Sequence, residues 1–270
     1  MKVLIAIDSF KGSLSSVQAG NAVKDAIIRL DNNAEIIIKP LADGGEGTVE
    51  ALASGFDSET IELTVNGPLL KPVNAKYCIL KETNTAVIEM AVASGITLIA
   101  ADERNPLETT TYGVGEIIKD AIKKGCRRFI VGIGGSATND GGTGMLTALG
   151  FEFLDKNNNP IALGAKGLKN LFKIKIDNVI PELKECSFNI ACDVTNPLCG
   201  ENGCSAVFAP QKGATPEMIK DMDDWLNNYG EIAKSVSSKA DKNYAGAGAA
   251  GGLGFAFHCF TNATLKSGMK

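Results

Sequence analysis

Apolar residues alternate along this chain between short runs typical of strands and longer stretches with helical spacing. Lys2 to Ile7 is a short apolar run with β-branched residues, which predicts a buried strand. Between Val17 and Leu30 the apolar residues recur at helical spacing, after serines that can cap a helix. Glu35 to Lys39 again has the pattern of a strand. Strand, helix and strand in this order predict a βαβ unit, and such units build parallel sheets.

The same alternation continues to the end of the chain and predicts an α/β fold with mostly parallel sheets. Further strands are expected over 59–65, 74–81, 85–90, 127–133 and 187–194, and helices from 48–52 onward and over 113–124, 143–149 and 215–238. The turn signal Asn66-Gly67-Pro68 is the best candidate for a domain boundary.

Composition narrows the class of protein. The chain has 270 residues, enough for one large domain or two modest ones, and its net charge of −4 argues against nucleic-acid and anionic-membrane partners. Its seven cysteines form no CxxC pair and it has one histidine, so a zinc site is not expected. We expect reduced cysteines and a cytoplasmic protein without a signal peptide or membrane span. The sequence leaves the oligomeric state open.

Four apolar strands lead into loops that carry an acidic residue: Asp8, Asp43, Asp140 and Asp193. In open parallel sheets the carboxyl ends of the strands form the ligand crevice. Glycine-rich loops such as 132–142 let backbone N–H groups approach an anion closely, and carboxylates in the same crevice can hold Mg²⁺ that bridges phosphate oxygens. The pattern therefore indicates nucleotide-phosphate chemistry; tight, capped turns are the simpler interpretation of any single loop.

Two other phosphate-binding motifs, the P-loop and the dinucleotide-binding run, would each indicate a different class of enzyme. No GxxxxGK[ST] run occurs, which excludes a P-loop enzyme. GxGxx[GA] occurs at Gly132–Ala137, with Asp155 at the distance of a ribose contact, and at Gly246–Gly251. The first runs into a poor helix opening and the second follows no apolar strand, so a nicotinamide-dependent oxidoreductase is the second hypothesis.

Eight segments together resemble the bacterial glycerate kinases of the two-domain type. They are DSFKGSLSS (8–16), KPLADGGEGT (39–48), EMAVASGI (89–96), ETTTYGVGEII (108–118), GIGGSATNDGGTG (132–144), CDVTNPLCG (192–200), FAPQKGA (208–214) and GAGAAGGLG (246–254). Their order and approximate spacing match along nearly the whole chain.

The resemblance implies an ATP-dependent, Mg²⁺-dependent kinase of D-glycerate that phosphorylates the 2-hydroxyl in preference to the 3-hydroxyl. It implies two α/β domains with the active site in the cleft between them: 1–66 plus about 258–270, and an inserted domain over 67–257. Family members continue past the position of Lys270 with a GEGR-type run, so a non-catalytic remnant that binds ligand is a third hypothesis.

Phosphoryl transfer needs positioning and charge neutralisation, and this sets the expected roles. Asp8, Lys11 and Asp193 are the expected catalytic residues, and Asp43, Glu46 and Asp193 the expected metal ligands. Substrate or phosphate contacts are expected from Asp43, Gly44, Gly45, Ser94, Thr110, Gly134, Gly135, Ser136, Asn139, Asp140, Lys212 and Gly248. Simpler alternatives are a helix cap by one of Thr109, Thr110 and Thr111, a closed turn at Ser136 and a solvated Lys212. His258 is expected to be a buried, hydrogen-bonded residue.

Overall fold

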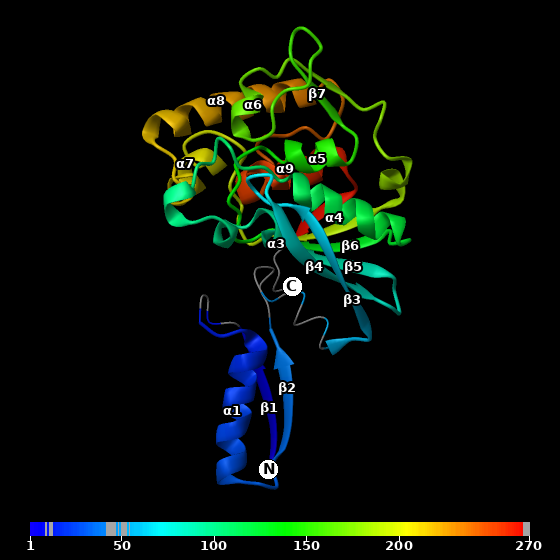
Figure 1. Cartoon of the computed structure of the whole chain (residues 1–270), viewed down its shortest axis with the longest axis vertical. Coiled ribbons are helices and arrows are strands. Elements are labelled where there is room, and N and C mark those ends of the chain that lie inside the picture. Colours follow the sequence, from blue (N-terminus) through cyan, green and yellow to red (C-terminus); the bar gives the residue numbers. More distant parts are fainter. Residues whose placement is uncertain are drawn as a thin grey trace.

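The fold consists of a small βαβ unit and a larger α/β body (Figure 1). A computed structural model describes residues 1–8, 10, 13–41, 47, 49, 53 and 55–266. The strands are β1 (Lys2–Ile7), β2 (Glu35–Pro40), β3 (Ser58–Asn66), β4 (Pro72–Leu80), β5 (Thr85–Glu89), β6 (Arg128–Gly132), β7 (Glu152–Leu154), β8 (Lys173–Lys175), β9 (Ser187–Ala191) and β10 (Ala263–Lys266). The α-helices are α1 (Ser16–Leu30), α3 (Ala91–Ser94), α4 (Tyr112–Lys123), α5 (Thr143–Ala148), α6 (Ala165–Leu168), α7 (Cys204–Phe208), α8 (Pro216–Ala233) and α9 (Ala249–Phe260). Single 3₁₀ turns are η1 (Ile96–Leu98), η2 (Ala101–Glu103), η3 (Pro181–Glu185) and η4 (Pro210–Lys212).

The βαβ unit forms as its sequence predicts. β1 and β2 pair in parallel, and α1 connects them. Of the candidate serines, Ser15 caps α1: its hydroxyl accepts from the Gln18 amide at 3.2 Å, and the Gln18 side chain accepts from the Ser15 amide at 2.9 Å. This reciprocal capping box fixes where the helix begins.

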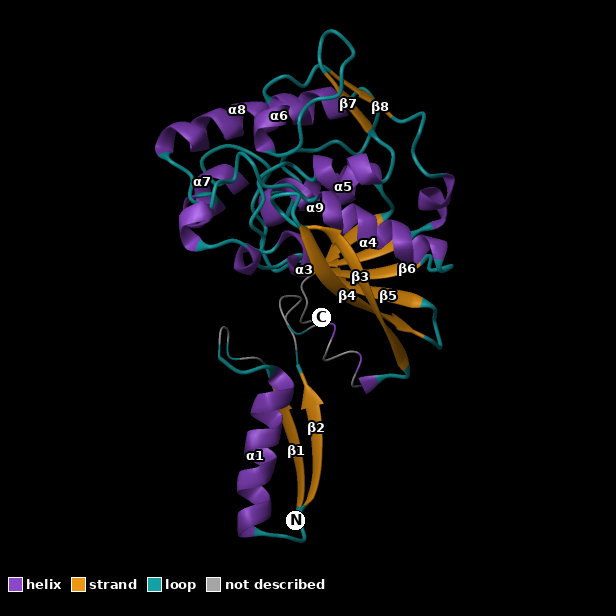
Figure 2. Ribbon diagram, viewed as in Figure 1, coloured by secondary structure: helices purple, strands orange, loops and turns teal. Residues whose placement is uncertain are grey.

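The larger body is built on a six-stranded sheet of order β10-β9-β6-β5-β4-β3. The pairs β10–β9, β9–β6 and β6–β5 are parallel, and β5–β4 and β4–β3 are antiparallel. Figure 2 shows α5 to α9 gathered on the side of this sheet away from β1 and β2. The expected fold class, α/β with mostly parallel sheets, is therefore confirmed.

Aromatic side chains fill the core between the central strands and α9. The rings of Phe129 on β6 and Phe188 on β9 stack at 4.6 Å, and Phe188 meets Phe257 of α9 at 5.5 Å. Tyr229 of α8, which is fully buried, packs edge-on against Phe255 at 5.2 Å. Such rings supply large buried apolar area and hold α8 and α9 to the sheet.

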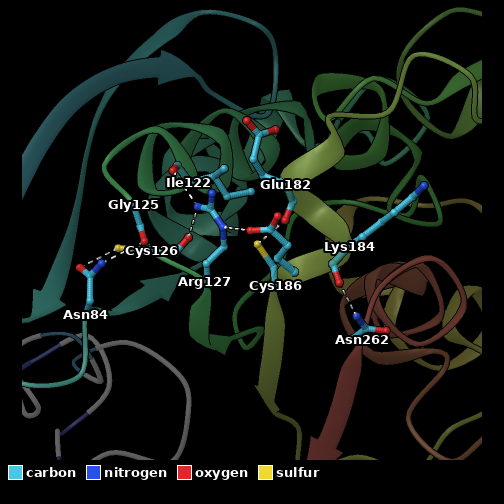
Figure 3. Close-up of polar contacts among 10 residues, drawn as sticks. Asn84, Ile122, Gly125, Cys126, Arg127, Glu182, Lys184, Cys186 and Asn262 are labelled. Atoms are coloured by element: carbon cyan, nitrogen blue, oxygen red, sulfur yellow. Dashed lines mark hydrogen bonds and ion pairs between the residues drawn. The ribbon is translucent and has the colours of Figure 1, made fainter.

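Polar contacts close the amino-terminal edge of the parallel strands (Figure 3). The Arg127 guanidinium donates to the carbonyl oxygens of Ile122 and Cys126 at 3.1 and 3.0 Å and pairs with Glu185 at 2.8 Å. The Asn262 amide donates to the carbonyl oxygen of Lys184 at 3.0 Å. Arg127 therefore has a structural role at this edge of the sheet.

Strand pairing bears on the predicted division into domains. β3 and β10 belong to the large sheet, although the predicted division assigned residues 58–66 and 263–266 to the first domain. The division into two domains stays a prediction, and these pairings favour a first unit that ends before Ser58. Most of the helix expected from 48–52 lies outside the described residues.

Close packing of α4 on α5 gives a test of stability. A Cβ at Gly115 would lie 2.4 Å from the Met145 carbonyl oxygen and 2.7 Å from the Ala148 Cβ. We expect Gly115→Ala to lower the free energy of unfolding by about 1–3 kcal/mol, because overpacking outweighs the better helix propensity of alanine. Urea unfolding measures the change. Gly55→Ala is the matched control, since a Cβ at Gly55 has no neighbour within 4 Å; equal midpoints for the two variants would contradict the packing argument.

Candidate active site

The candidate site lies at the carboxyl edge of the parallel strands. In the strand register Glu89 of β5 is opposite Gly132 of β6, and Gly132 is opposite Ala191 of β9. The loops after these three strands therefore start side by side. They carry Ser94, the glycine loop 133–142 and Asp193, which the sequence predicted to meet here.

The glycine loop is locked to the segment that follows β5. The Ile96 amide donates to the Gly135 carbonyl oxygen at 2.9 Å, and the Ala137 amide donates to the Ser94 carbonyl oxygen at 2.9 Å. Gly134 and Gly135 are exposed, and Gly135 has φ +72°, a conformation that favours glycine. Within the described part of the chain, the amides of Gly134 and Gly135 have no hydrogen-bond acceptor.

Asp140 is the centre of the buried polar network. Its side chain is fully buried. Oδ2 accepts from the Thr110 and Thr111 hydroxyls at 3.2 and 2.9 Å and from the amides of Thr111 and Gly144 at 2.8 and 3.3 Å. Oδ1 accepts from the Gly142 amide at 3.1 Å. Burial raises the pKa of Asp140, and the hydrogen bonds oppose that rise. This carboxylate joins the start of α4 to the start of α5.

Neighbouring hydroxyls are also engaged inside the protein. The Ser94 hydroxyl donates to the Thr110 carbonyl oxygen at 3.1 Å, and the Thr109 hydroxyl donates to the Ala137 carbonyl oxygen at 2.9 Å. The Thr110 hydroxyl accepts from the Tyr112 amide at 3.3 Å, but the N-cap residue of α4 is Thr111, and its side chain makes no capping hydrogen bond. Ser94 and Thr110 are both fully buried. Their predicted substrate contacts stay predictions.

Lys212 and Ser205 contact the inner side of the glycine loop. The Lys212 ammonium donates to the Ser136 hydroxyl at 2.9 Å and to the Thr138 carbonyl oxygen at 2.6 Å, and the residue is 2% exposed. The Asn139 amide donates to the Ser205 hydroxyl at 2.9 Å. The alternative of a solvated Lys212 is wrong. Nothing in the sequence pattern PQKGA signals this burial.

The two glycine-rich segments pack against each other. The Gly141 amide donates to the Gly251 carbonyl oxygen at 2.9 Å. A Cβ at Gly251 would lie 2.0 Å from the Thr138 carbonyl oxygen, and one at Gly252 would lie 2.7 Å from the Gly141 Cα. Gly251 and Gly252 have φ +66° and +92°. Close backbone contact therefore accounts for Gly251, the last glycine of the second GxGxx[GA] run, without a dinucleotide.

Two further residues behave differently from expectation. The Asp155 carboxylate, the candidate ribose contact, accepts from the amides of Asn157 and Asn159 at 2.8 and 2.9 Å in an exposed turn. His258 is half-buried and stacks on Tyr244 with ring centroids 3.6 Å apart. No hydrogen bond of its imidazole is found with the residues that the structure describes.

The remaining acids lie at strand ends. Asp193 is exposed just after β9, and Asp8 follows β1. Glu89 is not among the predicted site residues. It is buried at the end of β5, and its carboxylate accepts from the Val49 amide at 2.7 Å. That bond ties the segment after β2 to the large sheet. The arrowheads of β1 and β2 point toward the larger body (Figure 1).

Five of the predicted site residues lie outside the part of the chain that the structure describes: Lys11, Asp43, Gly44, Gly45 and Glu46. Gly248 is described: it is buried at the start of α9, and its amide donates to the Asn196 carbonyl oxygen at 2.9 Å.

Across the described ranges, no group of three or more His, Cys, Asp or Glu side chains is arranged to hold a metal. Nor does any helix in those ranges have the length and apolarity to cross a membrane.

Comparisons with known proteins agree with this arrangement. A profile of the glycerate kinase family matches residues 3–270. The chain is 46% identical over 270 residues to a glycerate kinase of Haemophilus influenzae and to a glycerate 2-kinase of Escherichia coli K12, covering all of this chain and 71% of each relative. A crystal structure from Salmonella typhimurium LT2, described as a glycerate kinase 2, superposes with a TM-score of 0.91 at 45% identity, over all of this chain and 72% of that one.

The α/β fold and these relatives define a phosphotransferase that uses ATP as co-substrate and acts on small molecules. More particularly, the chain belongs to the glycerate kinase family. The resemblance noted from the eight sequence segments is confirmed, and the oxidoreductase hypothesis is not favoured.

The Asp140 network predicts a large loss of stability on a minimal change. In Asp140→Asn an amide replaces one of the two buried acceptor oxygens, so at least one buried donor loses its partner. We expect the free energy of unfolding to fall by about 3 kcal/mol, measured by urea unfolding. Asp224→Asn on the exposed face of α8 is the control and should change it by less than about 0.5 kcal/mol. A comparable small change in both variants would contradict the central role of Asp140.

The buried ammonium predicts a pH dependence of stability. Burial lowers the pKa of Lys212 from 10.5 to about 8. Between these pH values the unfolded chain binds more protons than the folded one, so stability rises with pH. The unfolding free energy of the wild type, measured relative to Lys212→Met, should rise by about 1–3 kcal/mol between pH 8 and 10.5 and stay level below pH 7. A difference that is constant over this range would contradict the lowered pKa.

Proposed function

We propose that this chain phosphorylates D-glycerate with ATP and Mg²⁺ at the carboxyl edge of its large sheet. The observation that carries the proposal is the alignment of Glu89, Gly132 and Ala191, which brings three polar loops to one edge. The names of the Haemophilus and Escherichia relatives support glycerate as the acceptor. The name glycerate 2-kinase, and the resemblance itself, favour the 2-hydroxyl and thus 2-phosphoglycerate as product.

In this proposal the glycine loop binds phosphate. The exposed amides of Gly134 and Gly135, which have no acceptor in the described structure, supply N–H donors to phosphate oxygens. The loop is held rigidly by its bonds to Ser94 and Ile96, so the donors are preorganised. Asp140 and Asn139 act from within, by fixing the shape of the loop.

Asp193 is proposed as the acceptor of the proton from the substrate hydroxyl. It lies two residues after the end of β9, it is exposed, and its loop starts from the same edge as the glycine loop. A carboxylate in that position can take a proton or hold a metal, and the choice depends on the pose of the substrate. Asp8 and Lys11, which follow β1, are proposed to complete the site from the other side of the cleft between the two units.

The magnesium ion of this proposal is supported by the type of ligand that Asp193 offers. Mg²⁺ prefers oxygen ligands and is usually bound by one or two carboxylates together with phosphates and water. Asp193 supplies such an oxygen among the described residues, and Asp43 and Glu46 are the other proposed ligands. When bound, Mg²⁺ neutralises charge on the transferred phosphoryl group.

One assay tests the substrate and the product together. The chain with D-glycerate, ATP and Mg²⁺ should release ADP in a glycerate-dependent reaction, at about 1–100 s⁻¹ for an ordinary kinase. Phosphorus NMR against authentic 2- and 3-phosphoglycerate identifies the product, for which we expect the 2-isomer. Asp193→Asn should lower kcat by about 10²- to 10⁴-fold with an unchanged melting temperature, because the side chain is exposed.

Asp221→Asn, an exposed change on α8, is the control and should leave kcat unchanged. Binding of glycerate or ATP without turnover would support the remnant hypothesis instead of the kinase. A 3-phosphoglycerate product would overturn the regiochemistry alone, and an unchanged kcat in Asp193→Asn would overturn the role of that residue alone.

A further inference from the structure

Lys212 differs from the ion-paired lysines of the described structure. The lysine side chains that form ion pairs are 19% exposed in Lys242 and between 41% and 74% exposed in the others. Lys212 is 2% exposed, and its ammonium contacts a hydroxyl and a backbone carbonyl oxygen without a carboxylate partner among the described residues. Burying a charge without an opposite charge is unfavourable for folding. A protein that keeps such a lysine gains something from the charge.

A backbone hydrogen bond and a close packing contact fix the backbone at Lys212. Lys212 ends the turn η4, and its amide donates to the Ala209 carbonyl oxygen at 2.9 Å. Gly213 follows with φ +92°, and a Cβ there would lie 2.3 Å from the Arg104 carbonyl oxygen. A side chain other than hydrogen at this position would push η4 away from Arg104. The backbone of Lys212 is thus held in place by its contact with Ala209 and by the packing of Gly213 on Arg104.

The contacts of Lys212 fall on the inner side of the glycine loop. Ser136 and Thr138 receive its two hydrogen bonds, while Gly134 and Gly135 just before them are exposed. The carbonyl oxygens of Gly135 and Ala137 are also engaged by protein donors, Ile96 N–H and the Thr109 hydroxyl. Three carbonyl oxygens of the loop, those of Gly135, Ala137 and Thr138, thus accept from the protein, while two amides in its exposed part have no acceptor among the described residues.

We propose that Lys212 is a positioning residue for anion binding: it holds Ser136 and Thr138 from inside the protein so that the amides of Gly134 and Gly135 face a phosphate group. Its positive charge lies behind those amides and strengthens their attraction for an anion. This role rests on the proposed function of the loop. It differs from a direct phosphate contact, because the buried ammonium is occupied within the protein.

The charge of Lys212 also responds to pH in the range of an enzyme assay. Burial lowers its pKa to about 8, and the carboxylate of Asp140 after β6 opposes this shift; Cys204 on α7 also faces the ammonium. Burial raises the pKa of Cys204 to about 12, so that thiol stays neutral. The ammonium is therefore charged below about pH 8 and loses its charge above it, which should weaken phosphate binding at alkaline pH.

Lys212→Met tests the hydrogen bonds and the charge together, because it keeps a side chain of similar length and removes both. Lys220→Met, which removes an exposed charge on α8, is the matched control. In the ATP titration we expect KM to rise about tenfold or more for Lys212→Met, with a smaller change in kcat. Wild type and Lys220→Met should show KM rising from about pH 8, and Lys212→Met should show no such rise.

Hydrogen exchange of the ligand-free chain provides a readout that needs no activity. Peptides covering 132–140 should exchange faster in Lys212→Met than in the wild type and Lys220→Met. If Lys212→Met fails to fold, Ser136→Ala removes one of the two contacts and keeps the charge. It should also speed exchange of these peptides, while its KM keeps the rise at alkaline pH.

The outcomes distinguish this inference from the proposed function. An inactive wild type overturns the proposed function, and exchange of residues 132–140 still decides whether Lys212 holds the loop. An active wild type together with unchanged KM, pH profile and exchange in Lys212→Met overturns the role of Lys212 alone. Loss of kcat with unchanged KM and exchange would instead make Lys212 a group that acts on the reaction itself.

Discussion

The buried carboxylate of Asp140 is the interaction on which the rest of the site depends. Five hydrogen bonds from Thr110, Thr111, Gly142 and Gly144 converge on it, so it connects two helices and the loop between β6 and α5. A buried carboxylate is tolerated only when its oxygens are well supplied with donors. The same bonds that make this burial possible therefore fix the geometry of the glycine loop.

Glycine is needed in this arrangement because a Cβ would not fit, as well as because of the backbone conformation. The segments 132–144 and 246–254 approach at backbone distance, and Gly251 faces Thr138 where no Cβ would fit. Substitution at these positions would push α9 away from the loop, and its Phe257 away from Phe188 of β9. The polar edge and the aromatic core are thus two sides of one packed unit, and rigid support of this kind preorganises binding groups.

Much of the fold could be predicted from the sequence, because strand and helix periods are strong over segments such as Lys2–Ile7 and Tyr112–Lys123. The meeting of the loops after β6 and β9 at one carboxyl edge also followed from the sequence, whereas β1 and β2, which lead toward Asp8 and Asp43, form a separate two-stranded sheet. The burial of Lys212 could not be predicted, since it depends on a tertiary contact with Ser136 that no local pattern records. Glu89 escaped notice for a similar reason: an acid at the end of an apolar strand becomes notable only when its partner Val49 is known.

The acidic loops that looked alike in the sequence divide into two kinds once their surroundings are known. Asp140 is enclosed and its hydrogen bonds already supply both oxygens with donors, so binding a metal there would require breaking the loop that positions it. Asp193 is exposed at the edge of the same sheet, where a substrate or ion can approach without disturbing the core. A carboxylate that exchanges its partner during a reaction, as a proton acceptor or metal ligand does, is therefore better placed at Asp193. The carboxylate of Asp140 is suited to a fixed structural role, which keeps the binding loop in one conformation.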